Sequence, residues 1–192
     1  QQQYDEVALP LVFSANSAHF AYLAKKGKPW LAAVDGVESK EYEQVGGPIS
    51  FDAEGKRVAY SAKANDQWFI VADGQEGDRY NIAAGPILSS DGTRLAFAAK
   101  NAGRCFLVIA GQRQGDYDDL SASSLTFSPD GKHLCCMAKR DKSWFIIADG
   151  VEGKAYDALS YPLYSPDSSR LAYYGTRDGK VMVVVDGVEG AP

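Results

Sequence analysis

The sequence predicts an all-β protein, a five-bladed β-propeller of four-stranded antiparallel blades, and three features that repeat in phase along the chain predict it. An Asp-Gly pair ends an apolar run in four of the five repeats, and Ala110-Gly111 takes its place in the middle repeat. A tyrosine recurs at the same period, and so does a tight turn of the Ser-Pro-Asp-Gly type. The Asp-Gly pairs begin at Asp35, Asp73, Asp149 and Asp186, the tyrosines are Tyr4, Tyr42, Tyr80, Tyr117 and Tyr156, and the turns begin at Ser14, Asp52, Ser89, Ser128 and Ser165. Successive copies of each feature lie 37 to 39 residues apart.

Each repeat is predicted to form four short strands. The first is the run before the tight turn, such as 124–128, and proline and glycine at the second and fourth turn positions suit a type I turn. The second and third strands, such as 95–99 and 144–148, are apolar at nearly every position, which indicates that both of their faces are covered. The fourth is the short segment that begins at the repeat tyrosine, such as 156–159. A period of about 40 residues with four strands is typical of a propeller, in which each blade packs between two neighbours.

The repeat also resembles a known family. Residues 127–132, with the sequence Phe-Ser-Pro-Asp-Gly-Lys, are followed by Leu134 with its strand and then by 145–149, and this pattern is similar to the WD40-like PD40 repeat. That repeat builds the TolB propeller and the propeller domains of prolyl-oligopeptidase-type peptidases, and the resemblance covers the entire chain. It implies a propeller, a bacterial source and, from its relatives outside the cytoplasm, a periplasmic or secreted location. It implies no catalytic residue, because the family uses these residues to build blades.

A single domain, residues 1–192, accounts for the five repeats. Their phase places the blades at about 9–45, 47–83, 85–120, 123–159 and 162–190, with 1–8 completing the last blade. Tyr4 to Val7 match the fourth-strand segment, so we expect a ring closed by the N-terminal strand joining the last blade, which leaves no sheet edge unpaired. The alternative is a five-blade sector of a six- or eight-bladed ring.

Charge and hydropathy exclude two kinds of partner. A formal net charge of −5 gives no general attraction to nucleic acid. The longest apolar stretches, such as 144–148 and 181–185, are far too short to span a bilayer, so no membrane insertion is expected. The protein is expected to be a monomer.

The cysteines and histidines predict structural roles. Cys105, Cys135 and Cys136 occupy slots that hold aromatic or small apolar residues in other repeats, so we expect buried free thiols, which argue against an oxidising compartment. His19 and His133 fill a slot that holds arginine in the other three repeats, which indicates a generic exposed polar position. No catalytic residue, cofactor or metal ligand is predicted among them.

Two further patterns favour structure over binding. The Asp-Gly-x-Glu segments supply one aspartate and one glutamate at a hairpin turn, which is the expected turn chemistry and lacks a calcium ligand set. Trp30, Trp68 and Trp144 open the third strand and suggest an aromatic platform for a sugar, but cysteine or valine stands there in the other repeats, which favours packing between blades.

One charge pattern points to binding. The loops between the second and third strands are basic in every repeat, whereas the loops between the third and fourth strands are acidic in four, which predicts two faces of opposite charge. The candidate residues for an anionic small ligand or protein partner, one from each blade, are Lys28, Lys63, Arg104, Lys142 and Arg177. The function predicted is a non-catalytic binding or scaffold module that presents its loop faces to a protein or small ligand. The alternative is an enzyme, or the gating domain of one, that uses the central channel as its pocket.

Overall fold

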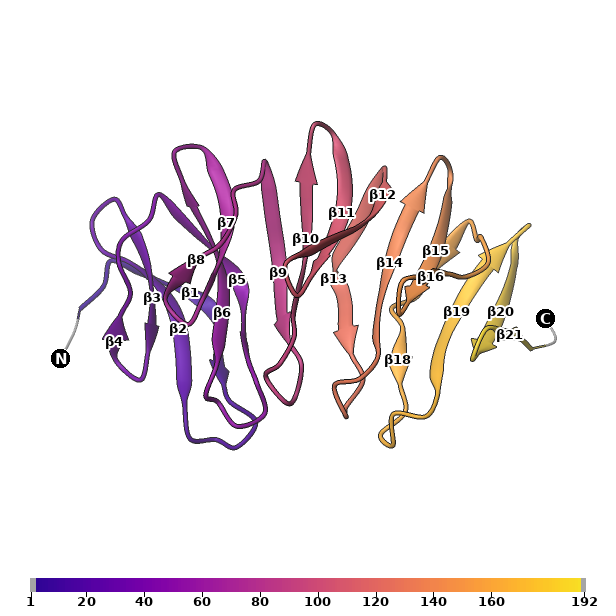
Figure 1. The fold of residues 1–192 in the computed structure, drawn as a ribbon, viewed down its shortest axis with the longest axis horizontal. Coiled ribbons are helices and arrows are strands. Elements are labelled where there is room, and N and C mark those ends of the chain that lie inside the picture. Colours follow the sequence, from indigo (N-terminus) through magenta and orange to yellow (C-terminus); the bar gives the residue numbers. More distant parts are fainter. Residues whose placement is uncertain (1–2, 191–192) are drawn as a thin grey trace.

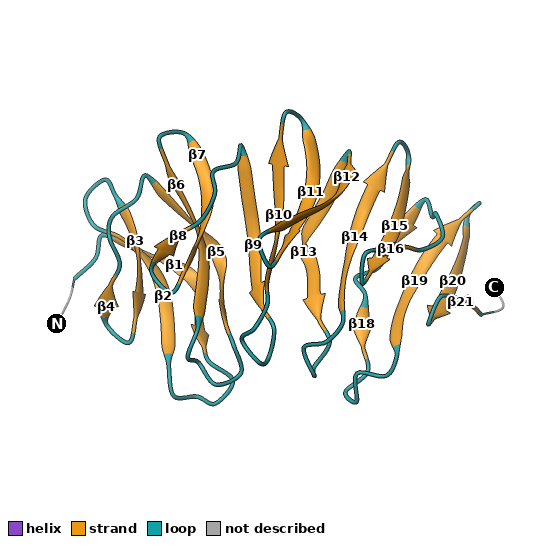
Figure 2. Ribbon diagram, in the orientation of Figure 1, coloured by secondary structure: helices purple, strands orange, loops and turns teal. Residues whose placement is uncertain are grey.

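The computed structural model describes residues 3–190, which form five separate antiparallel sheets and no helix (Figures 1 and 2). No segment of this part of the chain could therefore cross a membrane as a helix. Each sheet is one blade of the predicted propeller, and the all-β, five-bladed class is confirmed.

The strands follow one order in every blade, from the first to the fourth along the chain. The first blade contains β1 (Glu6–Phe13), β2 (Phe20–Lys25), β3 (Trp30–Val34) and β4 (Val37–Glu38), and the second contains β5 (Gln44–Phe51), β6 (Val58–Ala64), β7 (Gln67–Ala72) and β8 (Gln75–Glu76). The third contains β9 (Ile82–Leu88), β10 (Leu95–Asn101), β11 (Arg104–Ile109) and β12 (Gln112–Tyr117), and the fourth contains β13 (Asp119–Phe127), β14 (Leu134–Arg140), β15 (Ser143–Ala148) and β16 (Val151–Glu152). The fifth contains β17 (Ala158–Leu159), β18 (Leu163–Tyr164), β19 (Leu171–Arg177), β20 (Lys180–Val185) and β21 (Val188–Glu189).

The fifth blade differs because its first strand is divided. Both β17 and β18 pair with β19, one with Gly175 and Thr176 and the other with Leu171 and Ala172. In the other four blades the first strand stays continuous but changes register once against the second strand. Pro162 lies in the gap between β17 and β18, where a residue without a backbone N–H cannot join a hydrogen-bonded ladder.

The repeat tyrosine marks the point where the chain crosses from one blade to the next. Tyr42 bridges Trp30 at the start of β3, and the following residue, Glu43, already donates its backbone N–H to Lys63 of the second blade at 3.0 Å. The same crossing follows Tyr80, Tyr117 and Tyr156. The segment after the tyrosine therefore begins a new blade and does not form a fourth strand, and each blade begins a few residues earlier than its repeat boundary suggested.

This crossing overturns the predicted closure of the ring. Tyr4 to Val7 do not form the outer strand of the last blade: Glu6 and Val7 belong to β1 and pair with Lys25 and Ala24 of β2. The physical reason is that this segment, like its equivalent in every other repeat, continues directly into the first strand of the blade that follows it. The blades form an open row, with the first and fifth at opposite ends of the long axis (Figure 1).

The core lies between the blades. In the second blade, side chains on both faces of the second and third strands are buried, as their unbroken apolar sequence predicted, whereas one face of the same strands in the fifth blade is exposed at Tyr174, Val181 and Val183. The repeat tyrosines join adjacent blades: the ring of Tyr42, from the end of the first blade, lies edge-on against Tyr60 and Phe69 of the second. Tyr156 lies against Tyr173 in the same way between the fourth and fifth blades.

The turns have the predicted chemistry. In the tight turn between the first two strands, Gly131 donates its backbone N–H to the carbonyl of Ser128 at 2.8 Å, which is the bond of a four-residue β-turn. At the hairpin between the third and fourth strands, both residues of Asp149-Gly150 have positive φ, 50° and 81°. A two-residue hairpin of this kind is a type I′ turn, for which Asp-Gly is a preferred sequence.

Candidate functional site

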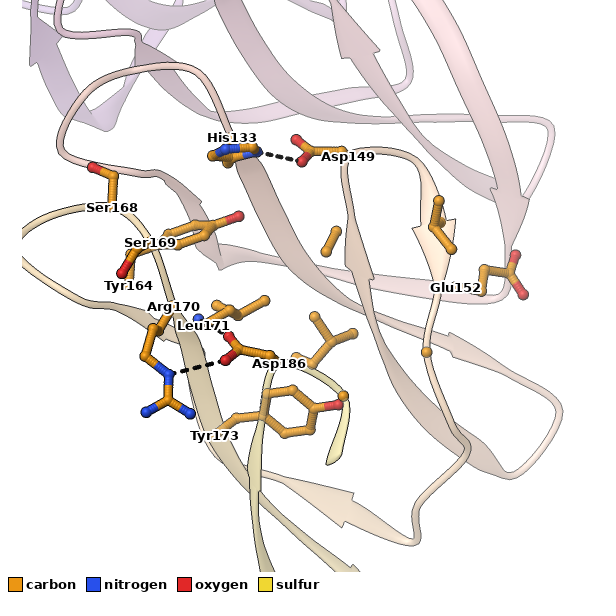
Figure 3. A pocket seen from close by; sticks show the side chains of 15 residues that line it. His133, Asp149, Glu152, Tyr164, Ser168, Ser169, Arg170, Leu171, Tyr173 and Asp186 are labelled. Atoms are coloured by element: carbon orange, nitrogen blue, oxygen red, sulfur yellow. Dashed lines mark hydrogen bonds and ion pairs between the residues drawn. The ribbon is translucent and has the colours of Figure 1, made fainter. Parts of the chain in front are cut away.

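The aspartate of each Asp-Gly turn reaches back to the start of the second strand. In the fourth blade, Asp149 accepts a hydrogen bond from the backbone N–H of Leu134 at 2.9 Å and pairs with Nδ1 of His133 at 2.7 Å (Figure 3). The same pairs recur as His19–Asp35 at 2.6 Å, Arg57–Asp73 at 2.8 Å and Arg170–Asp186 at 2.9 Å. Both histidines therefore occupy a repeated structural slot, as the sequence predicted. The hydrogen bond from His19 holds the pKa of Asp35 below its usual value.

The pocket drawn in Figure 3 is a cleft of about 340 Å³ between the fourth and fifth blades. It brings together two of these pairs, His133–Asp149 and Arg170–Asp186, and the ring of Tyr164 stacks on His133. An equivalent cleft of about 470 Å³ lies between the second and third blades, with Arg57–Asp73 in the place of the histidine pair. Because the arrangement recurs and its charged groups are already paired, the cleft belongs to the architecture of the repeat and does not form a unique catalytic centre.

The acidic segments do not converge on a metal site. Asp149 bonds the start of the second strand, whereas Glu152 of the same segment forms an ion pair with Arg140 at 2.7 Å. Among residues 3–190, no group of three or more histidine, cysteine, aspartate or glutamate side chains is placed to hold a metal ion.

The cysteines are buried free thiols, as predicted. Cys135 and Cys136 are at most 1% exposed, and burial raises the pKa of Cys135 to about 12. Burial also raises the pKa of Cys105. A thiol with a raised pKa carries little thiolate near neutral pH, so none of the three is activated as a nucleophile.

The tryptophans are packing residues that remain partly exposed. Trp68 and Trp144 lie against the apolar clusters between blades, as the sequence favoured. The ammonium groups of Lys25 and Lys139 lie 5.7 and 5.5 Å from the ring centroids of Trp30 and Trp144. The indole rings of Trp30 and Trp144 are therefore each approached by a lysine side chain of their own blade.

Another hollow lies along the first strands of the first four blades. It has a volume of about 590 Å³ and its wall is formed by β1, β5, β9 and β13 with the tight turns that follow them. The apolar residues of the wall are Val12, Phe13, Ile49, Phe51, Ile87, Leu88, Leu125 and Phe127. Asp52 is the one ionisable side chain lining it, and its carboxylate already accepts the backbone N–H of Arg57 at 3.1 Å.

Strand β1, which forms part of this hollow, exposes several large apolar residues, and we call the hollow the axial hollow. Phe13 is 67% exposed, and Leu9 and Leu11 precede it on β1 with more than half of their surface exposed. The sequence analysis did not identify this surface. A signal was available, because Pro10, Pro48, Pro86 and Pro162 recur at one distance from the repeat tyrosines and mark the irregular part of the first strand in four of the five blades.

The five predicted basic residues lie in or beside the hairpins between the second and third strands, one per blade, and three of them form ion pairs. The pairs are Lys63–Asp66 at 3.0 Å, Arg104–Asp116 at 2.6 Å with a second contact to Asp118, and Arg177–Glu189 at 3.0 Å. Lys28 and Lys142 form no ion pair with the residues that the structure describes. The structure thus spreads the five along the row and leaves two of the positive charges without a carboxylate partner.

Carboxylates that the sequence analysis missed lie on the same side of the molecule. The residue after the repeat tyrosine caps the hairpin of its own blade: Glu43 accepts the backbone N–H of Asn65 at 2.8 Å, and Asp118 accepts that of Asp141 at 2.6 Å. Asp5 and Asp157 act in the same way in the first and fifth blades. Their fixed position after the tyrosine was visible in the sequence, but their role depends on where the chain crosses between blades.

The two predicted charge sets also meet within blades. Arg140 and Arg177, from the basic loops, pair with Glu152 and Glu189, from the acidic segments. Hydrogen bonds from Arg177 and Tyr156 lower the pKa of Glu189 to about 2. The faces are therefore less strongly separated in charge than the sequence predicted, because long side chains bring the opposite charges together across each blade.

Solved structures share the arrangement of the blades. TolB from Acinetobacter baumannii is 16% identical over 96% of this chain and 53% of its own, with a TM-score of 0.56. The β-propeller domain of the Trilobed protease from Pyrococcus furiosus, described as having an open velcro topology, is 12% identical over 97% of this chain and 70% of its own, with a TM-score of 0.64. The fold is a β-propeller. An acylaminoacyl peptidase from Pyrococcus horikoshii contains a similar propeller, 15% identical over 97% of this chain and 39% of its own, with a TM-score of 0.58.

These similarities show the propeller fold alone. The chain spans about half of the TolB structure and a smaller part of the peptidase. The sequence matches no protein-family model and no curated protein.

Proposed function

We propose that this propeller is a non-catalytic binding module and that its axial hollow holds apolar side chains of a protein partner. The observation that carries the proposal is the lining of the hollow, which is apolar on four blades and contains one ionisable group, Asp52, already hydrogen-bonded. Binding sites combine concave apolar surface with a few polar groups, whereas an active site needs convergent ionisable groups of perturbed pKa.

The geometry suits an extended segment. The hollow runs across the ends of β1, β5, β9 and β13, and Phe13, Phe51 and Phe127 stand at one position in three of these strands. A chain with apolar side chains at intervals could contact several blades at once, and large aromatic side chains supply most of the binding energy in such contacts.

The enzyme alternative has less support. The peptidase neighbours suggest that a propeller of this type could gate a catalytic domain, but that role belongs to those proteins. In the present chain the histidines are engaged by Asp35 and Asp149, and the cysteines are buried.

We also place the chain with the TolB-type PD40 repeats, which makes a bacterial source and a periplasmic or secreted location part of the proposal. The turn chemistry at Ser128 to Gly131 and the similarity to TolB support it.

A second candidate is docking of an anionic partner on the hairpin face. Lys28 and Lys142 support it, because neither forms an ion pair with the residues described. Lys63, Arg104 and Arg177 would have to exchange their present carboxylates for those of the partner.

One experiment separates the two candidates. A displayed library of random peptides is selected on the immobilised protein, and the recovered peptides are tested at low and high salt. Binding at the axial hollow predicts peptides rich in aromatic and branched residues, insensitive to salt and lost in Phe51→Glu. Val37→Glu, an exposed position outside the hollow, is the matched control and should retain them.

Docking on the hairpin face predicts a different result. The recovered peptides would be acidic, their affinity would fall as salt rises, and Arg104→Glu with Lys142→Glu would abolish binding. Both sites would be refuted if the recovered peptides bound the Phe51→Glu variant and the Arg104→Glu, Lys142→Glu variant as well as they bind the unaltered protein. A selection that enriches no peptide would also refute both sites.

A further inference from the structure

The axial hollow contains one carboxylate that no ion pair neutralises. Asp52 is 6% exposed on the wall formed by β5 and its tight turn. The two basic residues nearest in sequence pair with other carboxylates, Lys56 with Glu54 and Arg57 with Asp73 at 2.8 Å. Within the part of the chain that the structure describes, Asp52 itself forms no ion pair. A carboxylate largely removed from water is costly unless a cation or several hydrogen bonds compensate it.

The repeat does not require a charge at this position. The other four tight turns begin with serine, and the side chain has the same structural role in each. Asp52 Oδ1 accepts the backbone N–H of Arg57 at 3.1 Å, and Ser89 Oγ accepts that of Arg94 at 2.9 Å. A serine would therefore complete the turn of the second blade, and the charge of Asp52 is additional to what the fold needs.

The second carboxylate oxygen of Asp52 is unused. Oδ2 accepts no hydrogen bond from the described residues, whereas Oδ1 holds the turn. Its neighbour in the third blade is Gly92, and a Cβ atom at that position would lie 2.7 Å from Oδ2. Glycine thus leaves the oxygen uncovered on this side. A strong acceptor therefore remains in a hollow whose other lining residues are uncharged.

We propose that Asp52 binds a lysine or arginine side chain of the partner segment whose apolar side chains occupy the axial hollow. This inference rests on the proposed function and names the charge that the segment carries. The aliphatic stem of a long basic side chain can lie along the apolar wall while its head group reaches the carboxylate. A hydrogen bond from a cation to a carboxylate is stronger than one between neutral groups, and here it satisfies Oδ2.

The sign of the charge separates this site from the hairpin face. The basic residues of the hairpin face favour acidic peptides, whereas Asp52 favours basic ones. Because the pair at Asp52 is largely removed from water, salt screens it only weakly. Binding at the axial hollow therefore stays insensitive to salt even though one charge takes part.

The peptides selected on the immobilised protein are the probe. Those that Phe51→Glu no longer binds should contain a lysine or arginine near their aromatic residues. Replacing that basic residue by methionine, which is uncharged and also unbranched, should weaken binding to the unaltered protein by roughly 10- to 100-fold. Asp52→Ser introduces the residue of the other four turns, and this variant should bind the basic peptide and its methionine version equally well.

Two further variants serve as controls. Asp52→Asn keeps the shape of the side chain and removes its charge, so it should also lose the preference for the basic peptide, and it replaces Asp52→Ser if that variant does not fold. Glu41→Gln removes one negative charge at an exposed position outside the hollow and should retain the preference.

The outcomes distinguish this inference from the proposed function. Peptides that depend on Phe51 but lack a basic residue would overturn the role of Asp52 and leave the apolar site intact. An undiminished preference for the basic peptide in Asp52→Ser would do the same. Recovery of no peptide that depends on Phe51 would overturn the proposed function, and this inference with it.

Discussion

Replacing Phe69 by alanine should remove one of the strongest contacts between the first two blades. Phe69 is 0% exposed, the ring of Tyr42 lies edge-on to it at 5.8 Å, and the guanidinium of Arg79 lies 3.6 Å from its ring centroid. Truncating a buried phenylalanine to alanine costs about 3–5 kcal/mol, which includes the lost burial and the cavity that remains. In a chain of this size each kcal/mol lowers Tm by roughly 2–4 °C, so the expected fall in Tm is roughly 6–20 °C.

The matched control is Phe13→Ala. Phe13 is 67% exposed on the axial hollow, so the same truncation should change stability by no more than about 0.5 kcal/mol. Urea unfolding followed by tryptophan fluorescence and circular dichroism measures both variants. If Phe69→Ala does not fold, Phe69→Leu keeps most of the volume and should cost about 1 kcal/mol. Equal losses from Phe69→Ala and Phe13→Ala would show that the packing between blades does not have the arrangement described.

Two further predictions concern reactivity and acid stability. Cys105, Cys135 and Cys136 should react with a thiol reagent only after denaturation, because all three thiols are buried and their pKa values are raised. Labelling of all three in the native protein within the mixing time would contradict the structure. Hydrogen bonds from the hydroxyls of Ser89, Ser128 and Ser165 lower the pKa of Asp91, Asp130 and Asp167 to about 2. In the unfolded chain these aspartates titrate near 3.8. Their carboxylates therefore stabilise the fold above about pH 4, and this contribution is lost as the pH falls towards 2. Urea midpoints at pH 6, 4 and 2.5 should fall in that order, and replacing the three partner serines by alanine should reduce the fall; a midpoint that is flat below pH 4 would be inconsistent with these hydrogen bonds.

The sequence by itself determined the class of fold and most of the local structure. Asp-Gly and Ser-Pro-Asp-Gly specify their turns because few residues adopt positive φ without strain, and the unbroken apolar runs require strands covered on both faces. The structural roles of His19, His133 and the cysteines also followed, because a slot that accepts different residues in different repeats does not depend on the chemistry of one of them.

Only the tertiary structure decided where one blade ends and the next begins. A strand pairs with whichever neighbour lies beside it, and the segment 4–7 has the same sequence pattern whether it ends one blade or begins another. The same limitation affected the charged face. Lys63 and Arg104 looked like unpaired loop cations, and only their distances to Asp66 and Asp116 showed that they are neutralised. Phe13 and Phe69 likewise look alike in sequence, but one lines an open hollow and the other lies fully buried between blades, because burial depends on what the fold places against a side chain.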